Sequence, residues 1–172
     1  MMSKRFVVPL AVIVVFTAGF VAAIILRNNS TNKQTTSTSQ ASPLSQPSGS
    51  ASLDYSGRGL AAFPKEVLKH TDAVSLNLSN NNLTGALPGE IRHLSNLEQL
   101  DVSNNKMTSI PAEIGQLKHL KVLNYANNKI TGLPLELGKL TQLQVLDLSG
   151  NNVSQHDLSL IRPKLQNTEI KL

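Results

Sequence analysis

Histidine, aspartate and serine lie together in one short stretch near the C-terminus, and these are the residue types of a hydrolytic triad. His156 and Asp157 are adjacent, and Ser154 and Ser159 are close by. Adjacent side chains rarely point toward the same reacting atom, so we interpret this stretch as a polar loop. The sequence has no P-loop, no glycine-rich dinucleotide turn and no zinc-ligand spacing. It therefore predicts a protein that is not an enzyme, with no catalytic residues and no cofactor.

A second possible chemistry is cation binding by acidic and amide side chains that recur along the chain. The series is Asp54, Asn77, Asp101, Asn124, Asp147 and Glu169. If each residue lies on its own strand of one sheet, successive Asp residues are roughly 10 Å apart, because neighbouring strands are about 4.8 Å apart. Calcium needs about six to eight oxygen ligands at close range. We therefore interpret the series as a solvated polar face and expect no metal site.

A repeat determines the elements that position these side chains. Four asparagines recur at intervals of 24, 23 and 23 residues, each within the apolar frame L-x-x-L-x-L-x-x-N-x-L: Asn81, Asn105, Asn128 and Asn151. Within each frame a short strand places alternate residues in the core and the residues between them in solvent. The Asn then turns the chain, and its amide can pair backbone groups that the buried turn would leave unsatisfied. We expect a structural role for all four.

These frames resemble those of the leucine-rich repeat family, whose repeats are roughly 20 to 29 residues long. The resemblance implies an α/β solenoid, a short horseshoe with a parallel β-sheet on its concave face. After each frame the chain passes through a proline and an acidic residue to an apolar pair, as in Pro111, Glu113, Ile114 and Leu117, and this is the expected convex segment. Repeat domains need atypical units at their ends. We expect such capping units around Arg58, which replaces the turn Asn, and in a last strand after Pro163.

Composition divides the chain into four parts. Residues 1–5 form a short head, which we expect to be cytoplasmic, and residues 6–26 are an uncharged apolar run. At about 1.5 Å per helical residue this run is roughly 30 Å long, enough to cross a bilayer. A cleaved signal peptide is the alternative, but its apolar region is about 7 to 15 residues long, so we favour a retained transmembrane signal-anchor. Residues 27–52, rich in Ser and Thr, are the expected disordered stalk, and residues 53–172 the repeat domain.

The net charge of the chain, +5, raises the possibility of nucleic-acid binding. Residues 53–172, however, contain 12 basic and 11 acidic side chains, a net charge of +1. Such a domain has no positively charged surface that would follow a phosphate backbone, so we expect no nucleic-acid partner.

The resemblance implies that partners bind the concave sheet. The residues expected to face outward there are Asn77, Glu98, Gln99, Asp101, Lys121, Val122, Asn124, Gln144, Val145 and Asp147. Val122 and Val145 are the one departure from uniform polarity, although a surface pair of Val is more often explained by strand propensity. The chain has no Trp, and its two Tyr are predicted to face the core, so the surface has no obvious aromatic anchor.

Two functions remain open. The first is a recognition module, tethered by a single pass in the cell membrane, that binds a protein or a cell-envelope or glycan ligand on the extracytoplasmic side. The second is a non-catalytic scaffold or regulatory subunit of a membrane complex, which would use the convex face or the transmembrane helix. The first predicts that altering Gln99, Lys121, Val122 and Val145 abolishes partner binding, and the second predicts that it does not.

Overall fold

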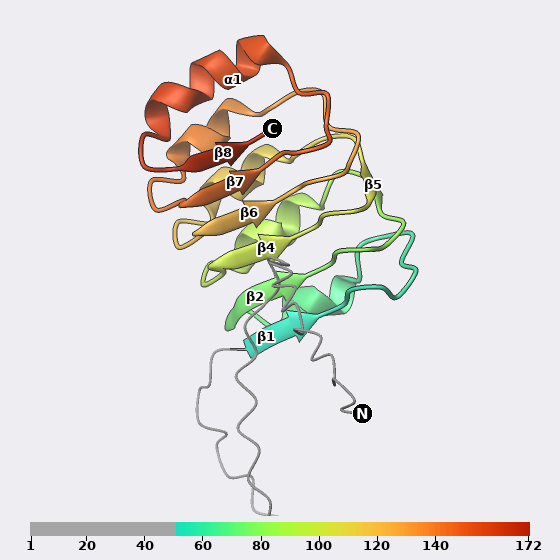
Figure 1. Cartoon of the computed structure of the whole chain (residues 1–172). Helices are drawn as coiled ribbons and strands as arrows, with labels where there is room; N and C mark the ends of the chain where they lie inside the picture. Colours follow the sequence, from blue (N-terminus) through green and yellow to red (C-terminus); the bar gives the residue numbers. More distant parts are fainter. Residues whose placement is uncertain (1–50) are drawn as a thin grey trace, which may run out of the picture. The chain divides into compact units, whose positions relative to one another are not determined.

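The computed structural model describes residues 51–172 (Figure 1). The expected head 1–5 and transmembrane helix 6–26 lie outside the described residues, as does all of the expected stalk 27–52 except its last two residues. Those two residues, Ala51 and Ser52, already belong to the first strand. Within residues 51–172, no helix has the length and apolar character needed to span a membrane.

Six parallel strands form the main sheet, and they are stacked in sequence order (Figure 1). Each repeat frame contributes one of them, as the alternation of apolar and polar residues predicts. The strands are β1 (Ala51–Asp54), β2 (Ala73–Asn77), β4 (Gln99–Asp101), β6 (Val122–Asn124), β7 (Val145–Asp147) and β8 (Glu169–Lys171). The predicted solenoid with a parallel sheet is therefore confirmed.

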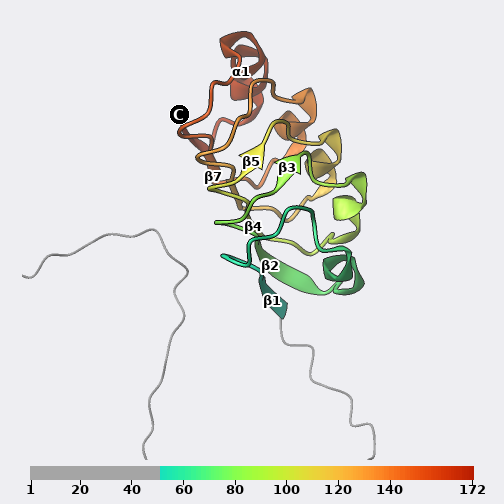
Figure 2. The same cartoon turned by 90° about the vertical axis from the view of Figure 1, so that its right-hand side faces the viewer.

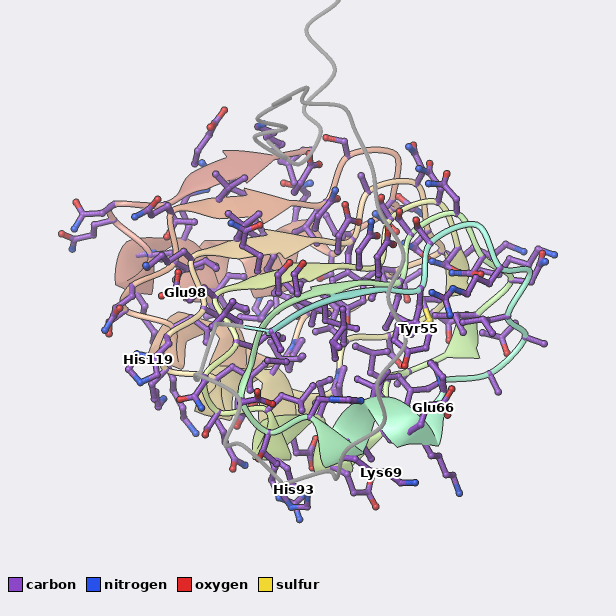
Figure 3. The ribbon with its side chains drawn as sticks, turned by 90° about the horizontal axis from the view of Figure 1, so that it is seen from below. Tyr55, Glu66, Lys69, His93, Glu98 and His119 are labelled. Atoms are coloured by element: carbon purple, nitrogen blue, oxygen red, sulfur yellow. The ribbon has the colours of Figure 1, made fainter. Side chains whose placement is uncertain are left out.

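The convex segments are short 3-10 helices, so the repeats of this solenoid are not built on α-helices. They are η1 (Lys65–Lys69), η2 (Gly89–His93), η3 (Ala112–Gln116) and η4 (Leu135–Lys139). A proline precedes each one, and each is closed by i to i+3 hydrogen bonds, such as Leu117 N–H to Ile114 O at 3.0 Å. Figure 3 shows Glu66, Lys69 and His93 beside these helices, away from the main sheet.

A second, two-stranded sheet lies on the connections that lead from the turns to the convex side. It consists of β3 (Thr84–Gly85) and β5 (Lys106–Met107), which run side by side in Figure 2. Gly85 lies in the unit that is one residue longer than its neighbours, and its φ of 72° is a conformation that glycine adopts without steric cost. The extra residue is therefore accommodated in this connection, and the main sheet keeps its register.

One hydrophobic core runs through all the repeats, between the sheet and the 3-10 helices. The leucines at the frame positions are fully buried, including Leu76, Leu100, Leu123 and Leu146. Tyr125 takes the place of a leucine in its frame and is also fully buried, but its hydroxyl has no hydrogen-bond partner. The first unit is packed less completely, because Leu53, Tyr55, Leu60 and Phe63 are only partly buried.

Side chains of the repeating asparagines connect successive repeats. The Oδ1 atom of Asn128 accepts a hydrogen bond from Met107 N at 2.9 Å, one repeat earlier. Its Nδ2 atom donates to the carbonyl oxygens of Val102, Tyr125 and Ala126 at 3.0, 3.0 and 3.2 Å. Equivalent bonds are made by Asn81, Asn105 and Asn151. Each amide thus bonds to backbone groups of the buried turn, and it joins two repeats through backbone atoms.

The last repeat differs from the prediction in two ways. The stretch expected to be a polar loop contains the α-helix α1 (Gln155–Ile161), followed by the 3-10 helix η5 (Arg162–Lys164). Because this connection is longer than the earlier convex segments, β8 pairs two residues out of the expected register. Lys171, instead of Glu169, lies beside Asp147, and Glu169 lies beside Val145.

Candidate binding surface

The strand register arranges the outward-facing side chains of the main sheet in two columns. Successive members of a column are directly paired across neighbouring strands. We call the first the valine column: Ser75, Gln99, Val122, Val145 and Glu169. We call the second the amide column: Asn77, Asp101, Asn124, Asp147 and Lys171. The predicted residues Glu98, Lys121 and Gln144 come directly before β4, β6 and β7, so all ten predicted residues lie on or next to this sheet.

Val122 and Val145 are direct neighbours in the valine column, and both are half-buried. Gln99 lies beside Val122 and Glu169 beside Val145, and both of these polar residues are exposed. The two valines are therefore a small apolar patch between polar side chains. An apolar centre with a polar rim is common in protein interfaces, and neighbouring valines are also common in strands because of their β propensity.

An ion pair borders this patch. The Lys121 Nζ atom lies 2.8 Å from Glu98 Oε2, and the two side chains are 40% and 42% exposed. The backbone supports the same arrangement, because Lys121 N donates to Glu98 O at 2.8 Å. At this exposure the pair contributes little to folding, and both charged groups are accessible to solvent.

In the amide column, the Oδ1 atom of each Asp or Asn side chain accepts a hydrogen bond from a backbone N–H of the turn that follows. Asp101 Oδ1 accepts from Ser103 N at 2.8 Å, and Asp147 Oδ1 accepts from Ser149 N at 3.0 Å. Equivalent bonds are made by Asp54, Asn77 and Asn124. The second side-chain oxygen of Asp101, Oδ2, accepts from Asn124 Nδ2 at 3.2 Å, so neighbouring members of the column are also bonded to each other. The column is thus partly structural, and its remaining polar atoms are held in fixed positions.

Asp54 is the first acidic residue of the amide series, and the pKa of its carboxyl is lowered. The main cause is the Ser56 backbone N–H, which stabilises the ionised form, and the Ser56 side chain and Arg58 act in the same direction. Among residues 51–172, no three His, Asp or Glu side chains are grouped closely enough to bind a metal ion.

Some side chains that the sequence places in solvent are in fact covered. Ser79 and Ser103 are each 6% exposed, and Ala126 is 9% exposed. Ser75, the first member of the valine column, is 7% exposed, and its hydroxyl has no hydrogen-bond partner. Small side chains between close strands are shielded by their larger neighbours, which an alternating pattern cannot indicate. Within the valine column, the accessible members are therefore those on β4, β6, β7 and β8.

Charge is separated between the concave sheet and the rest of the domain. Seven charged residues lie in the strands of the main sheet or directly before a member of the valine column: Asp54, Glu98, Asp101, Asp147, Glu169, Lys121 and Lys171. Five are acidic and two are basic, a net charge of −3. The remaining charged residues from 53 to 172 are ten basic and six acidic, a net charge of +4. The small overall charge of the domain conceals this difference between its faces.

Ser154, Asp157 and Ser159, three of the Ser and Asp residues near the C-terminus, use their side chains for structural contacts. Ser154 is the N-cap of α1, and its Oγ atom accepts from Asp157 N at 3.2 Å. Asp157 Oδ2 accepts from Leu133 N at 3.0 Å, which ties the helix to the preceding repeat. The spacing of Ser154 and Asp157, followed by the buried Leu158 and Ile161, is a helix-start signal that would have predicted α1.

Comparison with known proteins supports the geometry. A family model described as a leucine-rich repeat region matches residues 74–162. The chain belongs to the leucine-rich repeat family. No curated protein sequence is significantly similar to it.

Solved structures of this family resemble the repeat domain. A leucine-rich repeat protein of Leptospira interrogans is 37% identical with a TM-score of 0.55, over 66% of this chain and 34% of that one. The leucine-rich repeat ectodomain of the receptor kinase SOBIR1 from Arabidopsis thaliana is 27% identical with a TM-score of 0.55, over 68% of this chain and 65% of that one. The Arabidopsis receptor kinase HAESA ectodomain, solved with an IDA peptide hormone, is 30% identical with a TM-score of 0.56, over 63% and 19%. The chain therefore spans about one third of the length of the Leptospira protein.

Proposed function

We propose that the chain is a protein-recognition module that binds its partner on the concave sheet. The observation that carries this proposal is the patch formed by Val122 and Val145, which polar and charged side chains surround on an open sheet. Burying two neighbouring valines gives a partner an apolar contact, and the fixed polar atoms around them provide directional hydrogen bonds. The HAESA ectodomain, which has a similar fold, is described as binding a peptide hormone, and this supports a protein or peptide as the ligand class.

Charge narrows the partner class within this proposal. The concave residues have a net charge of −3, whereas the rest of the repeat domain is positive. A partner segment with net positive charge is attracted to the concave sheet and repelled from the other faces, so electrostatics orient the encounter. A glycan or other envelope ligand is the second candidate class, and protease treatment of the ligand preparation separates the two, because it destroys only a protein ligand.

We further propose that residues 6–26 anchor the module in a membrane and that the repeat domain faces the extracytoplasmic side. The length and apolar character of this run support the anchor. The likeness to plant receptor ectodomains supports the orientation. Protease added to intact cells tests it through a C-terminal tag. Loss of the tag while a cytosolic marker stays intact is the expected result, and a tag that becomes sensitive only after lysis contradicts the proposed orientation.

The binding face is tested by site-specific photo-crosslinking in the full chain. One variant places a photoreactive residue at Val122 on the concave sheet, and its control places it at Leu135 on η4, which is 48% exposed. We expect a crosslinked partner from position 122 and none from position 135. The reverse pattern contradicts recognition by the concave sheet and favours a scaffold that uses its convex face.

A substitution provides a second test that does not depend on crosslinking. Val122→Asp places a charge in the apolar patch, and Gln142→Asp places the same charge at an exposed position beyond η4. We expect the first variant to weaken partner binding at least about tenfold while the second binds normally. Burying an unpaired Asp charge in the interface costs more binding free energy than the loss of the valine contact alone. Equal binding by both variants contradicts the proposal.

A further inference from the structure

The outer edge of β8 is a surface that the proposed function does not use. Among residues 51–172, no strand is paired to the side of β8 that faces away from β7 (Figure 1). Leu172, which directly follows this strand, is 56% exposed, and Ile170 at its centre is only half-buried. An unpaired strand edge with apolar side chains is a template for pairing with another strand.

The existing hydrogen bonds define which backbone groups point outward. Glu169 N donates to Gln144 O at 2.8 Å, and Lys171 O accepts from Leu148 N at 2.9 Å, so both residues direct their backbone groups toward β7. Successive residues of a strand direct these groups to opposite sides. The N–H and C=O of Ile170 therefore point to the outer edge, where they are available to another strand.

We propose that β8 pairs antiparallel with β8 of a second copy of this chain, about a two-fold axis at Ile170. Ile170 of each copy then exchanges two backbone hydrogen bonds with Ile170 of the other, and the two main sheets become one continuous sheet. The axis places Glu169 of one copy directly opposite Lys171 of the other, and this contact occurs twice. On the core face, Ile170 packs on its symmetry mate, and Leu172 lies opposite Thr168.

Charge complementarity selects this arrangement over the alternatives. The order Glu169, Ile170, Lys171 is self-complementary only when the second strand runs in the opposite direction. A parallel copy in register would place Glu169 opposite Glu169 and Lys171 opposite Lys171, and like charges directly opposite each other are destabilising. Within one chain the Lys171 Nζ atom lies 4.0 Å from Glu169 Oε1, and the two side chains are 42% and 65% exposed, so both can rearrange toward the second copy.

Charge exchange tests the pairing in the full chain, purified in detergent, with the protein mass measured by light scattering. We expect a dimer for the natural sequence. Glu169→Lys and Lys171→Glu should each weaken it at least about tenfold, because each places like charges in both symmetric contacts. The double variant restores opposite charges at both contacts and should dimerise again. An equimolar mixture of the two single variants should also dimerise. Glu136→Lys, which breaks an ion pair with Lys139 on the convex face, is the matched control and should leave the dimer intact.

A cysteine crosslink tests the axis itself, since the chain has no natural cysteine. Residues directly opposite each other in an antiparallel hydrogen-bonded pair have Cα atoms about 5.5 Å apart, within the range that a disulfide spans. Ile170→Cys should therefore form a disulfide-linked dimer on mild oxidation, and Gln99→Cys, exposed on the same sheet, should not. A monomeric natural chain overturns the proposal. A dimer that none of the β8 charge variants weakens also overturns it, because such a dimer forms through another surface.

Discussion

Lys121 and Glu98 form an ion pair across neighbouring strands, with 2.8 Å between Nζ and Oε2, and both side chains border the valine patch. Because both are about 40% exposed, solvent screens their attraction. We expect Lys121→Ala to lower the free energy of unfolding by no more than about 0.5 kcal/mol, and less at high salt. Urea unfolding at two salt concentrations measures this. A loss above about 2 kcal/mol would show that the pair stabilises the fold instead of remaining available to a partner.

Removal of a turn asparagine should be far more damaging. Asn128→Ala leaves the buried Met107 N–H without a partner and removes one hydrogen bond from each of three carbonyl oxygens, all of which keep another donor. We expect a loss of about 2 to 4 kcal/mol in urea unfolding, because a buried donor is left unpaired and three further hydrogen bonds are lost. Asn151→Ala provides a graded control. Its turn is only half-buried, so water can replace part of the lost bonding and the loss should be smaller. Equal losses would contradict the view that burial determines the cost.

The sequence predicts the repeating strands and their turns well because each depends on local chemistry that recurs. The frame around Asn105 and the frame around Asn128 alternate apolar and polar residues in the same way, and each Asn connects to the preceding repeat as expected from its amide chemistry. The family and the parallel sheet followed from this recurrence. The convex segments were located correctly, but their 3-10 geometry was not predicted, because the repeat pattern indicates where the chain returns and not which hydrogen bonds it forms there.

The last repeat and the small concave side chains were less predictable for different physical reasons. The register of β8 depends on how much chain α1 and η5 use, and the helix start at Ser154 was interpreted as a loop. The burial of Ser79 and Ser103 depends on larger side chains of neighbouring strands, so it follows from three-dimensional contacts and not from sequence period. The positions of most concave residues were thus predicted, while the burial of the small side chains among them required the structure.

The hydroxyl of Tyr125 is fully buried without a hydrogen-bond partner. Tyr125→Phe removes this unpaired polar group, and we expect an increase in the free energy of unfolding of about 0.5 to 1.5 kcal/mol. Burial also raises the pKa of Tyr125 far above its ordinary value, because the ionised form would be desolvated. The unfolded chain therefore loses this proton near pH 10 while the folded chain keeps it.

Stability should accordingly decrease as the pH rises above about 10, since the unfolded state then binds fewer protons than the folded state. Urea unfolding between neutral pH and about pH 11 measures the effect, and the decrease should be smaller in Tyr125→Phe than in the natural protein. Tyr55→Phe, at a half-buried position, is the control and should retain the dependence caused by Tyr125. A destabilised Tyr125→Phe would mean that the hydroxyl has a partner, such as a bound water, in solution.

Gly115 lies where two convex helices approach most closely. A Cβ atom built there would lie 2.8 Å from Glu136 Cβ and would contact the Glu136 carbonyl oxygen even more closely, so η3 and η4 would have to separate. We expect Gly115→Ala to lower the free energy of unfolding by about 1 to 3 kcal/mol in urea. Gly132→Ala is the matched control, because the nearest atom to its Cβ would be Asp157 Oδ2 at 3.6 Å, an ordinary contact. That variant should be neutral or slightly stabilising, since alanine restricts the unfolded chain. Equal stability of Gly115→Ala and Gly132→Ala would contradict this prediction. It would mean that η3 and η4 can separate without loss of stability, and that their close packing does not hold successive repeats together.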